Sequence, residues 1–194
     1  MIHTVLGVLK EQLNAYYKIK AKVDDDLVKF IDSGSNDPVS FTNNAVTPFL
    51  INVSEDRTFR KPDQFRGITQ NGIRTQVNPE IRIELLVLFV SKFSDYAQAL
   101  NFLSYVIKCF QARRIFNPRN APALSGENIE KLILELVNLP LEEQNQVWHS
   151  LNTSYLPSVL YRIRVLTFLD DDSLQFVGEP AGEISRQLNQ TAGL

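Results

Sequence analysis

The fold class of this chain is decided by the stretch EIRIELLVLFV at residues 80–90. Every second position from Ile81 to Phe89 is apolar, which is the alternation of a strand with one buried face. The intervening positions change from charged at Arg82 to apolar at Val90, and continuous apolar runs indicate strands covered on both sides. The stretch therefore predicts a strand over residues 80–90, the strongest in the sequence, that is half-exposed at one end and buried on both sides at the other.

The sequence before and after residues 80–90 contains patterns that predict further strands and helices. Alternating or apolar runs predict further strands at residues 27–31, 45–54, 129–139 and 159–169. Apolar residues at three- and four-residue steps predict helices at residues 2–17 and 95–114. Pro140, followed by Glu142 and Glu143, predicts the start of a short helix over residues 140–148. The order predicts an α+β fold, a single mixed β-sheet of about four to five strands with two to three helices packed on it.

The helix over residues 95–114 has its own start signal and apolar stripe. Ser94 is a favourable N-cap, with Asp95 in the first turn, where a negative charge is stabilising. The expected buried stripe consists of Tyr96, Leu100, Leu103, Ile107 and Phe110. Cys109 lies within this apolar pattern and is expected to be a buried, unreactive thiol.

Length and composition are typical of one globular domain. The chain has 194 residues, of which 44% are hydrophobic and 22% charged. We expect a single domain over residues 1–172 and a polar C-terminal tail over residues 173–194, after the Asp170–Asp172 triplet.

A long connection at residues 57–76 is rich in basic side chains. It carries five of them against Asp63 alone, a balance of +4. The basic residues are Arg57, Arg60, Lys61, Arg66 and Arg74. Long connections in compact domains are usually functional or disordered. This segment is therefore either a candidate contact surface or a solvated loop.

Residue patterns typical of catalysis are not found in the sequence. The two histidines, His3 and His149, have no second His, Cys or carboxylate at metal-ligand spacing. Phosphate-loop, dinucleotide-binding and nucleophile-elbow motifs are missing as well. The expectation is a protein that is not an enzyme and has no cofactor or metal.

The net charge and the hydropathy of the chain argue against two classes of partner, nucleic acids and the membrane interior. A net charge of −2 argues against a nucleic-acid coat, which usually carries a basic face. The longest apolar run, Leu85 to Val90, is far shorter than the ~18 residues of a membrane span. We expect no nucleic-acid binding, no direct membrane insertion and a cytoplasmic location during assembly.

An ordered set of motifs resembles a known family. These motifs are VNP at 77–79, LFVSKFSDY at 88–96, IEKL at 129–132, ELVNL at 135–139, WHSL at 148–151 and YLPSVLYRIR at 155–164. The set is similar to the N-terminal domain of the cap, or tube-terminator, proteins of bacterial phage-tail-like contractile injection systems. The resemblance covers about residues 1–170 and is weakest over residues 20–75. The motif positions singled out are Asn78, Pro79, Phe93, Tyr96, Trp148, Tyr155, Pro157, Tyr161 and Arg164.

The resemblance implies a tail-terminator-like fold and a structural function. Such caps form a homo-oligomeric ring, of six subunits, on the last ring of the inner tube protein, contact the last ring of the sheath protein and stop polymerisation. The basic segment would then meet the tube or a neighbouring cap, and the tail or an exposed sheet edge would pair with the sheath. Trp148, Tyr155 and Tyr161 are assigned to packing first. The alternatives are a non-enzymatic adaptor that links the particle to a membrane or cargo, and an unrecognised enzyme.

Overall fold

The computed structural model describes residues 1–31, 39–56, 68–70, 73–75 and 82–167. The chain divides into two units, one with residues 1–57 and 81–167 and the other with residues 58–80 and 168–194. In the second unit, the described part is an antiparallel hairpin of β2 (Ile68–Gln70) and β3 (Ile73–Thr75). Both strands fall inside the connection predicted at residues 57–76, which therefore contains secondary structure that its sequence pattern did not indicate.

The first unit is built on one five-stranded sheet. Its strands are β1 (Ala45–Glu55), β4 (Arg82–Lys92), β5 (Ile115–Phe116), β6 (Ile129–Val137) and β7 (Ser158–Thr167), in the order β1-β4-β7-β6-β5. The α+β class and the single sheet are confirmed. All ladders are antiparallel, and the parallel pairing found among the described residues is one isolated bridge between Val28 and Val46.

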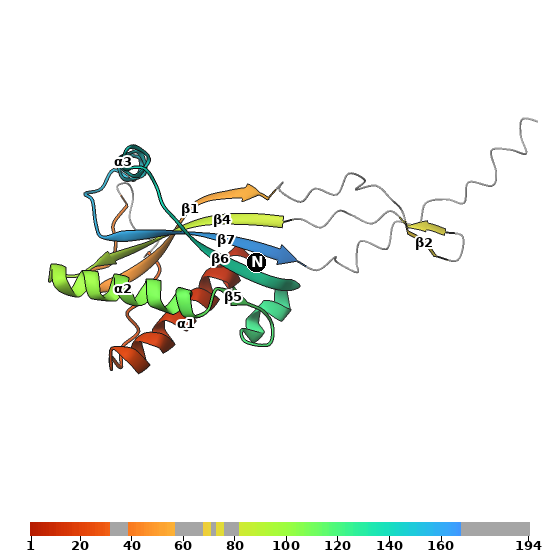
Figure 1. The fold of residues 1–194 in the computed structure, drawn as a ribbon, viewed down its shortest axis with the longest axis horizontal. Helices are drawn as coiled ribbons and strands as arrows, with labels where there is room; N and C mark the ends of the chain where they lie inside the picture. The colour runs from red at the N-terminus through yellow and green to blue at the C-terminus, as the bar shows by residue number, and fades with distance from the viewer. Residues whose placement is uncertain (32–38, 57–67, 71–72, 76–81, 168–194) are drawn as a thin grey trace, which may run out of the picture. The chain divides into compact units, whose positions relative to one another are not determined.

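Helices cover both faces of this sheet (Figure 1). The helices are α1 (Ile2–Lys20), α2 (Tyr96–Ala112), α3 (Leu141–Ser150) and the short 3-10 helix η1 (Pro122–Glu127). Helices α1 and α2 lie on one face and α3 lies on the other. The three α-helices agree with the prediction, whereas η1 was not predicted.

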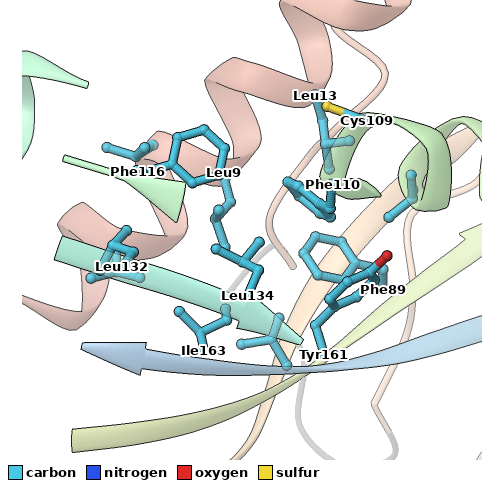
Figure 2. Packing of buried hydrophobic residues seen from close by; sticks show 14 of the residues in the cluster. Leu9, Leu13, Phe89, Cys109, Phe110, Phe116, Leu132, Leu134, Tyr161 and Ile163 are labelled. Atoms are coloured by element: carbon cyan, nitrogen blue, oxygen red, sulfur yellow. The ribbon is translucent and has the colours of Figure 1, made fainter. Parts of the chain in front are cut away.

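The main core lies between the sheet and the pair α1 and α2. Figure 2 shows Phe110 of α2 pointing at Phe89 of β4 and Tyr161 of β7, with ring centroids 5.3 Å and 5.2 Å away. Tyr17 of α1 is fully buried and donates its hydroxyl hydrogen to the carbonyl oxygen of Phe102 at 3.2 Å. Each such side chain contributes about 1.5–3 kcal/mol through burial, so this face holds most of the apolar stabilisation.

The segment predicted as a strand at residues 27–31 is not one. Val28 makes the single bridge to Val46, and the side chain of Asn14 takes up the main-chain groups of Val28. The N–H of Val28 donates to Asn14 Oδ1 at 2.9 Å, and Asn14 Nδ2 donates to the Val28 carbonyl oxygen at 3.4 Å. These groups point away from β1. The bridge does not extend along β1, because Pro48, which has the same orientation as Val46, has no N–H to donate.

Helix α2 begins one residue later than predicted. Asp95 is the N-cap and accepts hydrogen bonds from the N–H groups of Ala97 and Gln98. The N–H of Ser94 donates to Asn44 Oδ1. The cap is therefore a carboxylate at the positive end of the helix, which suits it better than a hydroxyl.

Candidate assembly surfaces

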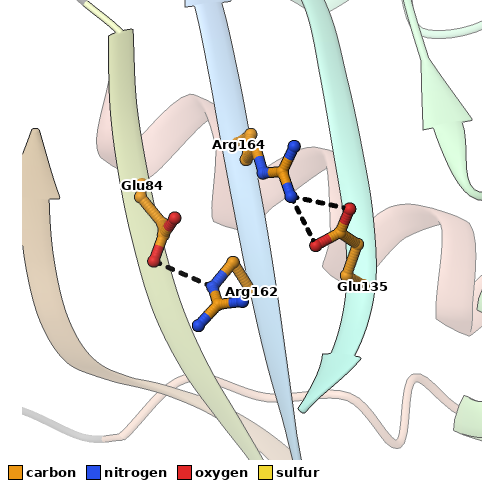
Figure 3. A network of polar contacts seen from close by, with 4 residues as sticks. All are labelled: Glu84, Glu135, Arg162 and Arg164. Atoms are coloured by element: carbon orange, nitrogen blue, oxygen red, sulfur yellow. Dashed lines mark hydrogen bonds and ion pairs between the residues drawn. The ribbon is translucent and has the colours of Figure 1, made fainter. Parts of the chain in front are cut away.

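The second face of the sheet carries a row of charges over its middle. Arg162 of β7 donates to Glu84 of β4 at 2.9 Å, and Arg164 of β7 donates to both carboxylate oxygens of Glu135 of β6 at 2.8–2.9 Å. Figure 3 shows the two pairs reaching from β7 to opposite neighbours. The four side chains are 21–41% exposed. We call this row the charge ladder; it links three strands and presents a polar, electrically balanced surface.

The same face becomes apolar toward α3. The cluster there contains Phe41, Leu88, Val90, Trp148, Leu151 and Leu160. Trp148 is 5% exposed, and its ring lies 6.1 Å from that of Phe41 and 5.5 Å from that of Tyr155. Its Nε1 has no hydrogen-bond partner among the described residues. Glu142 and Glu143 lie in the first turn of α3, where their charge favours the helix dipole.

A groove of about 220 Å³ opens where β6 parts from β7 and the chain crosses to α3. Its walls come from the end of β6, the start of β7 and one side of α3. Lining residues include Leu136, Asn138, Val147, Trp148, Ser158 and Leu160. We call it the edge groove. Leu136 is 49% exposed although it is apolar and lies in a strand.

The two edges of the sheet differ. Along β1, Val46 turns its N–H and C=O outward to residues 27–29. Pro48 has the same orientation two residues on, so its lack of an N–H removes an outward donor. A bulge then falls between Leu50 and Asn52. Proline and bulges both hinder pairing of an edge with another strand.

The opposite edge lacks such features over its last residues. The N–H of Leu134 in β6 donates outward to the carbonyl oxygen of Arg114 at 2.9 Å, next to the short β5. Leu136 has the same orientation, two residues further along the strand. Beyond Leu134, no other residue in the described part of the chain pairs with the outer side of β6. This edge is open and apolar beside the edge groove.

Helix α2 also exposes apolar side chains. Tyr96 is 66% exposed and Leu100 is 40% exposed. The buried stripe of the helix consists of Ala99, Phe102, Val106, Cys109 and Phe110. The predicted stripe was thus displaced around the helix, except at Phe110. Because α2 is apolar on more than one side, its contact with the sheet and α1 selected the buried stripe.

Most of the predicted basic surface lies outside the described residues. This applies to Arg57, Arg60, Lys61 and Arg66, and also to the motif residues Asn78 and Pro79. Arg74 is in β3, opposite Thr69. The structure therefore leaves the proposed contact role of this segment as a prediction.

The remaining motif residues fall into packed and exposed groups. Phe93 stacks on Phe102 with ring centroids 4.7 Å apart, Tyr161 is 4% exposed in the main core, and the carbonyl oxygen of Pro157 accepts the N–H of Ser91 at 2.9 Å. Tyr155 is 60% exposed, and its Oη accepts a 3.4 Å hydrogen bond from Gln144.

Sequence reasoning singled out Arg164, which is in the charge ladder, but not Leu136 of the open edge. In the sequence, Leu136 has the same alternation as the buried Leu132 and Leu134. Only the strand order places it at an edge.

The described residues offer little for catalysis or metal binding. Cys109 is buried as predicted, and burial raises the pKa of its thiol to about 11, so the nucleophilic thiolate is disfavoured. Within residues 1–31, 39–56 and the other described segments, no three His, Cys, Asp or Glu side chains gather closely enough to hold a metal ion. None of the described helices is both long and apolar enough to span a membrane.

Comparison with known proteins identifies related folds. Residues 4–178 match the Pvc16 N-terminal domain. No curated protein matches the sequence. Among solved structures, the fold is similar to the PVC sheath/tube terminator of an extracellular contractile injection system in its extended state, with a TM-score of 0.55 and 20% identity over 88% of this chain. It is also similar to the tube-terminating cap of the anti-feeding prophage, with a TM-score of 0.55 and 16% identity over 86% of this chain. The alignments cover 57% and 55% of those two proteins, so this chain corresponds to little more than half of their length.

Proposed function

This chain belongs to the Pvc16 N-terminal domain family, and we propose that it is a structural cap that terminates the tube and sheath of a contractile injection system. The observation that carries this proposal is the family match over residues 4–178, joined to a fold shared with two terminators. In the proposed role, a ring of subunits binds the last ring of the inner tube, contacts the last sheath ring and prevents further addition.

A cap ring makes three different demands on each subunit. Closure by rotation needs two unlike surfaces that meet head to tail. Binding to the tube needs a third surface, and termination needs an upper side that no further tube subunit fits. The described unit offers unlike surfaces for this purpose. The charge ladder and the apolar edge groove differ in chemistry on the same strands, and the exposed stripe at Tyr96 and Leu100 lies on α2.

The basic segment at residues 57–76 is our candidate for the contact with the tube or with a neighbouring cap. It has a charge balance of +4, although the whole chain has a net charge of −2. Complementary charge across an interface sets its register and speeds encounter more than it adds affinity. We therefore expect this contact to weaken as salt is raised.

The proposed role requires no chemistry from the chain. The state of Cys109, the only cysteine in the sequence, agrees with such a role. Its thiol is buried and protonated, which makes it a poor nucleophile. The particle assembles around the protein through packing and charge.

The proposal is tested by electron microscopy of sheath–tube particles assembled with and without this protein. We expect particles of controlled length with a terminal ring in its presence, and overlong or bare tubes in its absence. A third sample carries the charge reversals Arg60→Glu and Arg66→Glu, and a matched control carries Lys29→Glu and Arg119→Glu, two exposed cations elsewhere in the chain. Among the samples that contain the protein, ring docking should be lost only with the Arg60→Glu and Arg66→Glu variant.

Two results would contradict the proposal in different ways. Uniform, capped particles without the protein would overturn the terminator role and favour an adaptor between the particle and a membrane or cargo. Normal docking by the Arg60→Glu and Arg66→Glu variant would overturn only the contact assigned to the basic segment.

A further inference from the structure

The open edge of β6 is suited to accept a strand from another molecule. The outward-facing main-chain groups of Leu136 have no partner among the described residues, whereas β1 at the other edge has Pro48 and a bulge. An exposed sheet edge without such features is a template for strand addition.

The surroundings of this edge define what kind of strand fits. Successive side chains of an added strand point to opposite faces of the sheet. On one face they would meet Leu136, and on the other they would enter the edge groove beside Val147 and Trp148. The groove is short, so four or five residues with apolar side chains on both faces suffice.

The chain itself contains such a segment after β7. Residues 173–177 read Ser-Leu-Gln-Phe-Val. In an added strand, Leu174 and Phe176 would share one face, and Val177 would lie on the other face with Ser173 and Gln175. The match to the Pvc16 N-terminal domain continues to residue 178, eleven residues beyond Thr167 at the end of β7, so the family's domain includes this segment.

The charges next to the donor segment and next to the acceptor edge are of opposite sign. The acidic triplet Asp170–Asp172 directly precedes the segment. Arg114 is exposed at the β6 edge, where its carbonyl oxygen accepts the hydrogen bond from Leu134. A segment that enters the edge beside Arg114 would bring its carboxylates to a cation.

We propose that residues 173–177 of one subunit add as a strand to the open edge of β6, beside the edge groove, in the neighbouring subunit of the ring. This inference rests on the proposed ring and names one of its subunit contacts. The donor segment and the acceptor edge are different surfaces of one subunit. Each subunit therefore donates one strand and accepts one strand, which is the head-to-tail arrangement that closes a ring.

The reach of the chain favours a neighbour over the same subunit. The edge groove lies at the Ser158 end of β7, and the segment leaves from the Thr167 end, about 30 Å away at ~3.3 Å per residue. Leu174 is seven residues beyond Thr167, a span of at most ~25 Å when fully extended. Reversing direction would use part of that length, so Leu174 would fall short of its own groove. Phe176 and Val177 could extend at most ~32 Å and ~35 Å from Thr167, so they would reach it only if the chain between were almost straight.

Disulfide trapping in the full chain tests the proposal. In a Cys109→Ala background, one preparation carries Asn138→Cys at the acceptor edge and a second carries Gln175→Cys in the donor segment. On mixing and mild oxidation, we expect a covalent dimer that neither preparation forms alone. The matched control replaces Asn138→Cys with Val53→Cys, a 43% exposed position on the other edge, and should give at least tenfold less dimer.

A second pair of variants tests the contact without a cross-link. Leu136→Asp and Phe176→Asp should each shift the protein from ring to monomer by native mass spectrometry while the unfolding midpoint of the monomer stays unchanged, because Leu136 is half-exposed and already tolerates water. Rings with both variants, or equal cross-linking at both edges, would overturn the strand addition. A third preparation carries Asn138→Cys and Gln175→Cys in the same chain. If a bond forms only in this preparation, and within single chains, the strand addition between subunits is overturned in favour of self-docking. Capping of particles is scored separately, so loss of the strand contact and loss of the terminator role give different results.

Discussion

The two faces of the sheet bury very different side chains on the same strands. Toward α1 and α2, β4 and β7 present Leu85, Phe89, Tyr161 and Ile163, all at most 4% exposed. On the other face the same strands present Glu84, Arg162 and Arg164, each paired and partly exposed. Alternation along a strand makes this separation possible, because neighbouring residues point to opposite faces.

The difference between these faces separates stability from assembly. The α1 and α2 face contains the larger apolar cluster and closely packed aromatic rings, so changes there alter folding. The α3 face has a smaller cluster, the charge ladder and the edge groove, so surface changes there alter contacts with little effect on folding. Three predictions test this separation, in decreasing order of effect.

The largest effect is expected for Phe110→Ala on the α1 and α2 face. Phe110 is 1% exposed and touches the rings of Phe89 and Tyr161, so its removal leaves a cavity between α2 and the sheet. We expect a loss of about 3–5 kcal/mol in the free energy of unfolding, measured by urea denaturation followed by circular dichroism. Leu100→Ala, on the exposed side of the same helix, is the matched control and should cost less than ~1 kcal/mol. Equal losses for the two variants would mean that α2 does not pack as described.

An intermediate effect is expected from raising the pH. Burial raises the pKa of the Cys109 thiol from 9.0 to about 11 in the folded protein. An unfolded chain loses this proton near pH 9, so the contribution to stability is complete below pH 9 and is lost as the pH rises to about 11. The difference of about two pH units between the unfolded and folded pKa values corresponds to a loss of at most about 3 kcal/mol in the free energy of unfolding.

The Cys109→Ala variant isolates this contribution. Its unfolding free energy should fall less steeply between pH 9 and pH 10 than that of the unchanged protein, in urea titrations at each pH. This range lies below the pKa of Tyr161, which burial raises to about 12. Parallel curves for the two proteins would show that the thiol is not protected by the core.

The smallest effect is expected in the charge ladder. Glu135→Gln removes the charge that Arg164 contacts, but both side chains are about a third exposed or more, and solvent screens such pairs. A double-mutant cycle with Arg164→Gln should give a coupling below ~1 kcal/mol that decreases with added salt. Coupling of several kcal/mol would place the ladder among the main stabilising contacts and would contradict the contrast between the faces.

Local sequence patterns predicted most of the helices and strands, because the spacing of apolar residues shows which face of an element is buried. The alternation at residues 80–90 predicted β4, and the three- and four-residue steps predicted α1 and α2. Helix α3 was predicted from Pro140 and the two glutamates that follow it. Short elements were missed where long-range contacts create them. Strand β5 has two residues and depends on its pairing with β6. The sequence at 27–31 predicted a strand, but in the fold Asn14 binds the main-chain groups of Val28.

By itself, the sequence determined the α+β class, the strand that became β4, the burial of Cys109 and the resemblance to tube-terminator caps, since these depend on residue type and spacing. Only the tertiary structure decided the strand order, the buried stripe of α2 and the exposed position of Leu136. The physical reason is that a strand or helix pattern says which side chains avoid water but not which partner covers them. Leu136 and Leu134 are equivalent in the pattern of β6, and only the extent of pairing beside them leaves one open and the other buried.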